Sequence, residues 1–174
     1  MRLLRAADRV AKPWKNGGGV TRDVATFPSG ADVTNFDWRI SIADVHAAGP
    51  FSCFVGIDRI LTVLNGRLTL RFVESGETVM LDPGNPFAFS GDVAVEGEPM
   101  NGLVRDLNVM VRRGLWRAEV KPWQAGQPAI GNRIAIATSA CAGIQPLDAL
   151  ILPPGANPPP DFVGLVARFN GTSM

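Results

Sequence analysis

RILTVLNGRLTLRF, residues 59–72, carries two short runs of apolar and β-branched residues on either side of an Asn-Gly pair. In an extended chain successive side chains point to opposite faces, so runs of this kind are typical of half-buried strands. Asn-Gly tolerates the positive φ angles of a type I′ turn. The sequence therefore predicts a tight two-residue hairpin at Asn65-Gly66, joining strands 59–64 and 67–72.

Similar runs recur along the rest of the chain. They lie between turn signals at 38–43, 78–81, 88–89, 93–95, 107–111, 116–120, 134–137, 149–152 and 163–169. Turns are well supplied by 19 glycines and 14 prolines, and helical periodicity is not sustained over several turns anywhere. Short strands at this spacing predict an all-β fold, either an antiparallel sandwich or a barrel.

The length of 174 residues is enough for one domain with a full core or for two small fused barrels. Trp, Pro and Gly cluster in segment 115–131, but strands are expected on both sides of it. We therefore expect one unit, 1–174, built from two unequal β halves. The Pro-rich segment 153–160 is too short to link domains and predicts a stiff, extended loop, with a proline-recognition ligand as the alternative.

Composition narrows the class of partner. The chain has 17 Lys and Arg against 16 Asp and Glu, a net charge of +1, which disfavours general nucleic-acid binding. Residues 1–9 return to charged side chains too quickly for a signal peptide, and the longest uncharged apolar stretch is shorter than the roughly 18 residues of a membrane span. We expect a cytoplasmic protein without a nucleic-acid or membrane partner, in which Cys53 and Cys141 are reduced, buried thiols.

Segments 49–66 and 81–87 resemble the two halves of a cupin motif through their Val-Leu-x-Gly and Pro-Gly turns. Metal-dependent cupins gather three histidines and a glutamate from adjacent strands, as a divalent ion requires converging donors. This chain has a single histidine, His46, and mostly apolar residues where such ligands would stand. We therefore expect no metal and no cofactor. His46 is predicted to be an exposed loop residue, with a catalytic acid or base as the alternative.

The segment KNGGGVTR, residues 15–22, is the most unusual run. A phosphate-binding loop would need the lysine after the glycines and a helix beyond it, so that reading fails. Consecutive glycines cost backbone entropy, and Trp14 beside the run offers a flat apolar face. The segment is either a plain turn before a strand or the rim of a ligand pocket.

Two predicted strands carry polar residues with a period of two. In 38–43 the polar face holds Arg39 and Ser41, and in 105–110 it holds Asp106 and Asn108. A solvated strand face explains this pattern simply. The functional alternative is a polar cluster inside a barrel, in which an arginine grips a carboxylate through paired N–H donors.

Six blocks together resemble the HutD/Ves family. In chain order they are 13–22, 36–43, 49–52, 56–59, 86–92 and 105–110. The resemblance covers roughly residues 1–117, and the rest is compatible with a degenerate second half. It implies an RmlC-like jelly roll of bicupin type, with two fused β-barrel halves, 1–117 and 118–174, in a bacterial protein without a metal.

The resemblance also implies a ligand pocket. The family's shared polar and aromatic positions fall here on Trp14, Asn16, Thr21, Arg22, Trp38, Arg39, Ser41, Phe51, Arg59, Phe89, Asp92, Asp106 and Asn108. We expect all of these except Asp92 to line the site, with Arg39 and either Arg22 or Arg59 pairing the ligand's carboxylate. The implied role is regulation of histidine utilisation by binding a small carboxylate such as formylglutamate or another pathway intermediate.

Two other functions stay open. A metal-free isomerase or lyase on a small acidic metabolite would use Asp106 as base, with Lys15 or an arginine stabilising negative charge. A protein-binding scaffold, or a stress-response protein of the Ves type, would use the Pro-rich segment 153–160 or an exposed strand edge. Because the net charge is near zero, the protein's solubility depends on its exposed strand edges being covered. A homodimer, which could cover such an edge, is compatible with the sequence.

Overall fold

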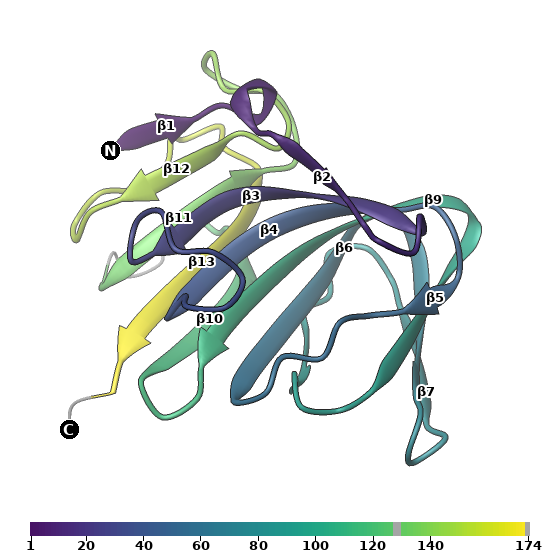
Figure 1. The fold of residues 1–174 in the computed structure, drawn as a ribbon. Helices are drawn as coiled ribbons and strands as arrows, with labels where there is room; N and C mark the ends of the chain where they lie inside the picture. The colour runs from purple at the N-terminus through teal and green to yellow at the C-terminus, as the bar shows by residue number, and fades with distance from the viewer. Residues whose placement is uncertain (127–129, 173–174) are drawn as a thin grey trace. The chain divides into compact units, whose positions relative to one another are not determined.

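The computed structural model describes residues 1–126 and 130–172, and strands form almost all of its regular structure (Figure 1). A three-residue 3-10 helix, η1 (Ala6–Asp8), is the exception within these residues. The predicted all-β class is confirmed. The chain forms two compact units, one of Val10–Arg113 and one of Met1–Arg9 with Gly114–Met174.

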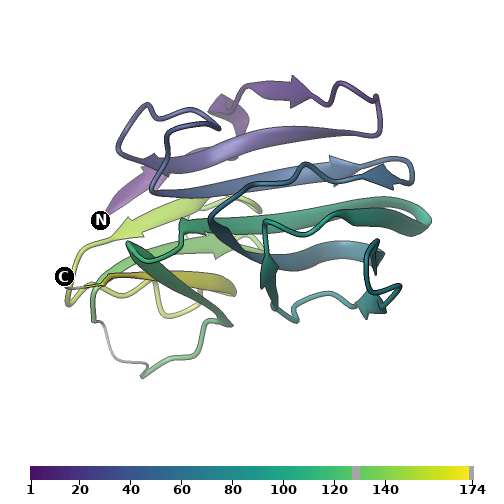
Figure 2. The ribbon, with the colours of Figure 1, turned by 60° about the horizontal axis from the view of Figure 1, so that its bottom comes forward.

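The unit Val10–Arg113 is built on one antiparallel sheet of eight strands. Its main order is β2 (Ala11–Pro13), β3 (Gly19–Phe27), β4 (Trp38–Val45), β9 (Val95–Arg112), β6 (Ile57–Phe72) and β7 (Thr78–Leu81). Two further strands add to it: β5 (Gly49–Pro50) pairs with β9, and β8 (Phe87–Ser90) pairs with β6. Figures 1 and 2 show β3, β4, β9 and β6 side by side. By this pairing the sheet is open.

The predicted hairpin at Asn65-Gly66 is wrong. β6 runs through this pair and stays hydrogen-bonded to β9 from Ile57 to Phe72. Gly66 does adopt the expected positive φ, +82°, but at an irregularity in the pairing, not at a reversal. A Cβ there would come 2.9 Å from the Leu103 carbonyl oxygen, so the close approach of β9 also requires glycine.

The irregularity divides β6 into two halves with different neighbours. Residues 58–61 pair with β8, whereas residues 68–71 pair with β7. The apolar core packs beside both halves and consists of Val45, Leu61, Val63, Leu68, Leu70, Leu81, Val95 and Val104. Partly buried aromatic side chains cover this core, among them Trp14, Phe51 and Phe89.

The second unit has an open antiparallel sheet of five strands. Their order is β1 (Arg2–Leu4), β12 (Ala149–Leu152), β11 (Asn132–Ala137), β13 (Gly164–Gly171) and β10 (Trp116–Pro122). Residues 1–9, which the sequence placed with the first half, belong here because Arg2 of β1 pairs with Ile151 of β12. The buried Asp148 fixes this segment by accepting hydrogen bonds from Ala6 N at 2.7 Å and Arg5 Nη1 at 2.9 Å.

Both cysteines are free, as predicted, but the expectation that they are buried is wrong. Cys53 is exposed because it lies in the loop between β5 and β6, and Cys141 is half-buried in a turn. His46 is an exposed loop residue, as expected. None of the described helices is long and apolar enough to cross a membrane.

Candidate functional site

One face of the eight-stranded sheet collects most of the predicted site residues, and we call it the site face. Ser41 of β4 lies directly opposite Asn108 of β9, and Asp106 follows two residues away on the same face. Arg39 and Arg59 both lie opposite Met110, one from each neighbouring strand. The polar faces predicted for β4 and β9 are thus one surface. Arg39, Ser41, Arg59 and Asp106 are each at most 6% exposed on it.

Arg39 already has a carboxylate partner. Its Nε donates to Asp23 Oδ1 at 2.7 Å, and its Nη2 lies 2.5 Å from the same oxygen. Lys12 Nζ binds the other oxygen of Asp23 at 2.6 Å. Burial acts to raise the pKa of Asp23, but the hydrogen bonds and charges of Lys12 and Arg39 outweigh it and lower the pKa. The Arg39 guanidinium is therefore neutralised within the protein.

Arg59 is held differently. It is 4% exposed, and among the described residues no carboxylate lies within ion-pair distance of it. Its Nη1 donates to the Ser52 carbonyl oxygen at 3.2 Å, while its buried Nε has no described hydrogen-bond partner. The guanidinium carbon lies 5.9, 5.5 and 5.0 Å from the ring centres of Phe51, Phe54 and Phe89. Burial lowers the pKa of Arg59 to about 10, while the negative charge of Asp106 acts to raise it. The guanidinium therefore stays cationic at neutral pH, and the three rings can contact it as cation–π partners.

Asp106 and Asn108 complete the polar part of the site face. Burial raises the pKa of Asp106 to about 7, the positive charge of Arg59 acting against the rise and the negative charge of Asp44 adding to it. Asn108 Oδ1 is buried and has no described hydrogen-bond partner. The site face thus offers an unused donor, an unused acceptor and a carboxyl group that titrates near neutral pH. Such a set can bind a small polar anion or transfer a proton.

Aromatic residues border this polar group. Trp14 and Phe51 meet edge to face with ring centres 5.6 Å apart, and Trp14 Nε1 donates to Thr21 Oγ1 at 2.7 Å. The Phe51 ring lies against the backbone of Gly97, where any Cβ would overlap it. The predicted residues Trp14, Thr21, Phe51 and Phe89 therefore lie beside the polar group of the site face.

Three predicted site residues are elsewhere. Arg22 and Trp38 alternate with the site-face residues of β3 and β4, so they lie on the opposite face of the sheet. Arg22 Nη1 binds Asp44 Oδ2 there at 2.8 Å, and Trp38 stacks on Phe27. Asn16 closes the glycine-rich turn by accepting a hydrogen bond from Gly18 N at 3.0 Å.

The glycine run is needed for packing. A Cβ on Gly19 would come 2.7 Å from the Asp44 carbonyl oxygen and 3.0 Å from the Trp14 ring. The run therefore lets β3 pass beneath Trp14, while Lys15 at its start is exposed. Its position favours a tight turn that supports the aromatic border.

Sequence reasoning missed Asp23, Lys12 and Phe54. The period of two from Thr21 would have placed Asp23 on the site face, so that signal was available. Lys12 shares the face because it lies opposite Thr21 in the β2–β3 pair. Phe54 reaches Arg59 from an irregular loop, which no periodic pattern predicts.

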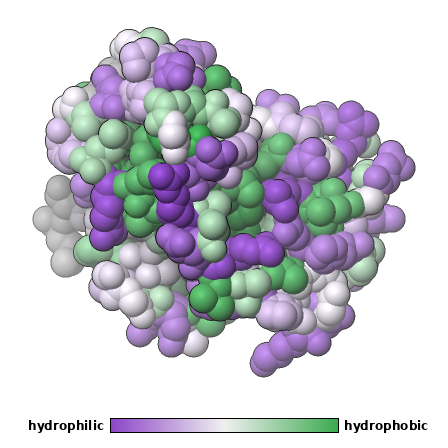
Figure 3. Space-filling view, turned by 90° about the horizontal axis from the view of Figure 1, so that it is seen from above, coloured by the Kyte–Doolittle hydropathy of each residue, from purple (hydrophilic) through white to green (hydrophobic). Residues whose placement is uncertain are grey.

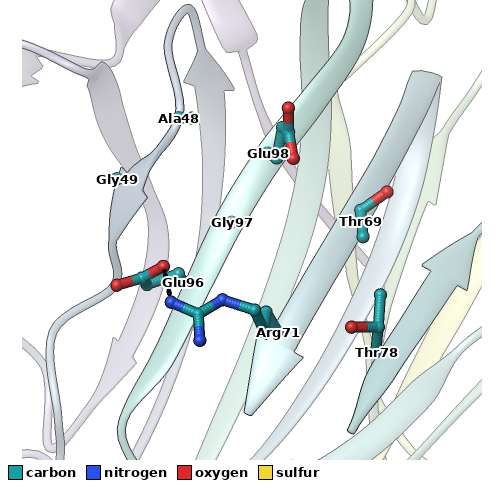
Figure 4. Close-up of a pocket in the computed structure, with 8 residues that line it drawn as sticks. All are labelled: Ala48, Gly49, Thr69, Arg71, Thr78, Glu96, Gly97 and Glu98. Carbon is teal, nitrogen blue, oxygen red and sulfur yellow. Dashed lines mark hydrogen bonds and ion pairs between the residues drawn. The ribbon is translucent and has the colours of Figure 1, made fainter. Parts of the chain in front are cut away.

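A shallow pocket of about 150 Å³ lies on the other side of β6 and β9, outside the core (Figure 4). Figure 4 shows Arg71 of β6 paired with Glu96 of β9, with Thr69, Thr78 and Glu98 around them. None of its lining residues belongs to the predicted site. On the face seen in Figure 3, hydrophilic and hydrophobic residues are interspersed. In 1–126 and 130–172, His, Cys, Asp and Glu nowhere gather in a group of three that could hold a metal ion.

Comparison with known proteins gives consistent matches. A family model described as HutD matches residues 6–141. An uncharacterized 21.2 kDa protein in the hutC 3′ region of Pseudomonas putida is 40% identical over 121 residues, which are 70% of this chain and 63% of that protein. Protein Ves of Citrobacter koseri is 37% identical over 109 residues, 62% of this chain and 56% of Ves. The chain thus matches less than two thirds of either relative's length.

A solved structure agrees over nearly the whole chain. It is described as HutD from Pseudomonas fluorescens SBW25 in a formate condition, and it superimposes with a TM-score of 0.83 at 27% sequence identity. The match covers 99% of both chains, so it extends over both units.

Proposed function

Since this chain belongs to the HutD/Ves family, we propose that it binds a small carboxylate metabolite at the site face and thereby regulates histidine utilisation. The name of the Pseudomonas putida relative, which refers to the hutC region, supports the link to histidine utilisation. We also propose that the two units, each with an open sheet, are the two halves of a bicupin-type fold.

The state of Arg59 carries the proposal. A buried guanidinium without a carboxylate is costly, and the unused Nε adds the cost of an unpaired buried donor. A ligand carboxylate would remove both penalties by accepting charge-assisted hydrogen bonds. The three phenylalanine rings exclude water around the guanidinium, which strengthens such a bond.

The structure changes the roles expected for the arginines. Arg39 is paired with Asp23, and Arg22 lies on the other face with Asp44. We therefore assign the carboxylate to Arg59, with Asn108 Oδ1 accepting a hydrogen bond from a donor on the ligand. Ser41, opposite Asn108, would help to fix the ligand's orientation.

The test is a thermal-shift screen followed by calorimetry. Wild type, Arg59→Met and Arg59→Lys are titrated with formate, glutamate, formylglutamate, formiminoglutamate, urocanate and histidine. A probe at 100 times its Kd adds roughly 2.7 kcal/mol of stability, enough for a visible rise in Tm.

In Arg59→Met, the Kd for the probe that wild type binds should rise tenfold or more, and Arg59→Lys should restore part of the affinity. Arg117→Met, at an exposed site, is the matched control. Unchanged affinity in Arg59→Met would contradict the assignment.

One observation favours a second candidate function. Asp106 has a pKa raised to about 7 by burial, and a general base works best when its pKa lies near the working pH. An isomerase or lyase acting on a small acid could use Asp106 to take a proton and Arg59 to stabilise the resulting charge. Turnover of the same probes by wild type, lost in Asp106→Asn although the probe still binds, would favour this function. Turnover that persists in Asp106→Asn would exclude Asp106 as the base.

A further inference from the structure

The register of β6 and β9 places three polar side chains of the site face in consecutive rows. Arg59 of β6 is opposite Met110 of β9, and Asn108 and then Asp106 follow Met110 along β9 in steps of two residues. Each step is roughly 7 Å and keeps the side chain on the same face. The row of Asn108 therefore lies between the row of the Arg59 guanidinium and that of the Asp106 carboxyl group.

The carboxyl group of Asp106 is buried among side chains that cannot pair with it. Asp106 is 2% exposed, and its direct neighbours across the sheet are Ala43 of β4 and Val63 of β6. Among the described residues no side chain donates a hydrogen bond to it, and Arg59 and Asp44 act on it through charge alone. Because a buried carboxylate without donors is costly, burial favours the neutral acid and raises the pKa of Asp106 to about 7.

The other charged and titratable groups around Asp106 come from every neighbouring element. Those of β2, β3 and β4 on the site face form one chain of ion pairs, in which a single aspartate binds a lysine and an arginine. The acid of β4 on the opposite face is held between two arginines. These groups are Lys12, Asp23 and Arg39; Asp44 with Arg22 and Arg105; Cys53, whose charge acts on Arg59; and His46 in the exposed loop after β4.

An anion on Arg59 changes the balance at Asp106. A ligand carboxylate held by the guanidinium brings a second negative charge toward the Asp106 carboxyl group. Two carboxylates in one buried site repel each other, and such a pair is stable when it holds one proton. The neutral carboxyl group can donate its O–H to a ligand oxygen, whereas the ionised group has no donor. Binding thus favours the protonated form of Asp106.

We propose that Asp106 binds the ligand as a neutral acid, donating its proton in a hydrogen bond to the carboxylate that Arg59 holds, so that the site takes up one anion together with one proton from solvent. This inference rests on the carboxylate site of the proposed function. The site is then specific for oxyanions that accept both contacts, and its affinity is greater in mildly acidic than in alkaline solution. In the complex Asp106 already carries a proton, so there it cannot act as a base.

The experiment measures the Kd of formate and of glutamate by calorimetry from about pH 5.5 to about pH 8.5, where both probes keep their carboxylates ionised. For wild type, the Kd should be nearly constant below about pH 6 and should rise toward tenfold per pH unit above about pH 7, because one proton is bound with the anion. Heats measured at about pH 8 in Hepes and in Tris, which differ in ionisation enthalpy, should show uptake of roughly half a proton or more for each bound probe.

Asp106→Asn separates the proton from the shape of the side chain. The amide keeps a donor but does not titrate, so its Kd should not change with pH and should be several-fold lower than that of wild type at about pH 8.5. His46→Gln and Cys53→Ser remove two other groups of kinds that ordinarily titrate in this range. Glu98→Gln removes an exposed carboxylate from the same strand. These three controls should keep the pH dependence of wild type.

A second measurement on wild type is independent of the stability of any variant. The titration midpoint of the Asp106 carboxyl carbon resonance should move to higher pH when a probe saturates the protein. Saturable binding with a pH-independent Kd, or a midpoint that falls on binding, would overturn this proposal and leave the carboxylate site of Arg59 standing. Persistent pH dependence in Asp106→Asn would assign the proton to another group and overturn it as well. Absence of saturable binding of formate and glutamate would overturn it too, and its extension to all probes of the screen would overturn the proposed function.

Discussion

The Phe51 ring lies against the backbone of Gly97, so closely that a side chain on residue 97 would overlap it. The same ring contacts Trp14 edge to face and lies 5.9 Å from the guanidinium carbon of Arg59. A position on β9 that carries no side chain thus determines where the aromatic border of Arg59 lies.

Gly97→Ala should therefore displace Phe51. We expect a loss of about 1–3 kcal/mol in the free energy of unfolding, typical of overpacking, and weaker binding of any probe that depends on Arg59. Urea denaturation and calorimetry measure the two effects. Gly171→Ala is the control, since a Cβ there meets only the Trp116 ring at an ordinary 3.9 Å. Wild-type stability in Gly97→Ala would show that Phe51 moves freely.

Arg39→Met should act on stability far more than on binding. Because Arg39 is paired with Asp23, its removal leaves a half-buried carboxylate with Lys12 alone. A double-mutant cycle with Asp23→Asn should give a coupling energy of about 1–3 kcal/mol in urea denaturation. The Kd of a probe that needs Arg59 should stay within a few-fold of wild type. A tenfold weaker Kd in Arg39→Met would instead place the ligand's carboxylate on Arg39.

Asp106 should make the protein less stable as pH rises toward neutrality. Its pKa is about 7 in the folded protein and about 4 in the unfolded chain, so the folded state holds the proton more tightly. The resulting stabilisation is complete below pH 4 and is lost between pH 4 and 7, up to about 4 kcal/mol. The difference in unfolding free energy between wild type and Asp106→Asn isolates this group, because other titrations cancel. A difference that does not change across this pH range would exclude the raised pKa.

Asp148→Ala should release the N-terminal segment. The carboxylate accepts hydrogen bonds from Ala6 N, Gln145 N and Arg5, which outweigh the effect of burial and lower its pKa. Its contribution is present at neutral pH and is lost as pH falls below about 4. We expect a loss of about 2–4 kcal/mol, and faster hydrogen exchange in residues 2–4 than in the rest of the sheet. Asp161→Ala, at an exposed position, should change neither quantity.

Much of the strand pattern could be read from the sequence. Strands at 78–81 and 149–152 have the predicted bounds, because short β-branched or apolar runs between turn residues allow few other structures. The prediction of a hairpin at Asn65-Gly66 was wrong because a residue with positive φ fits a β-bulge as well as a turn. The pairing with β9 decides whether a bulge or a turn forms at this position, and the residues of β9 are far away in the sequence.

The candidate site was only partly predictable for a similar reason. Alternation in β4 and β9 correctly joined Arg39, Ser41, Asp106 and Asn108 on one face. The same alternation excludes Trp38, whose aromatic character suggested a pocket. No local pattern could tell a paired Arg39 from an unpaired Arg59, since the difference lies in Asp23 on a third strand.

The pairing of β1 with β12 also has a consequence for synthesis on the ribosome. The strands of Val10–Arg113 emerge consecutively and have all their partners once Arg113 has left the exit tunnel. β1 emerges before the other strands described here, yet its neighbour β12 ends at Leu152. β1 is therefore translated long before its partner strand exists, and it must stay unpaired until Leu152 has emerged.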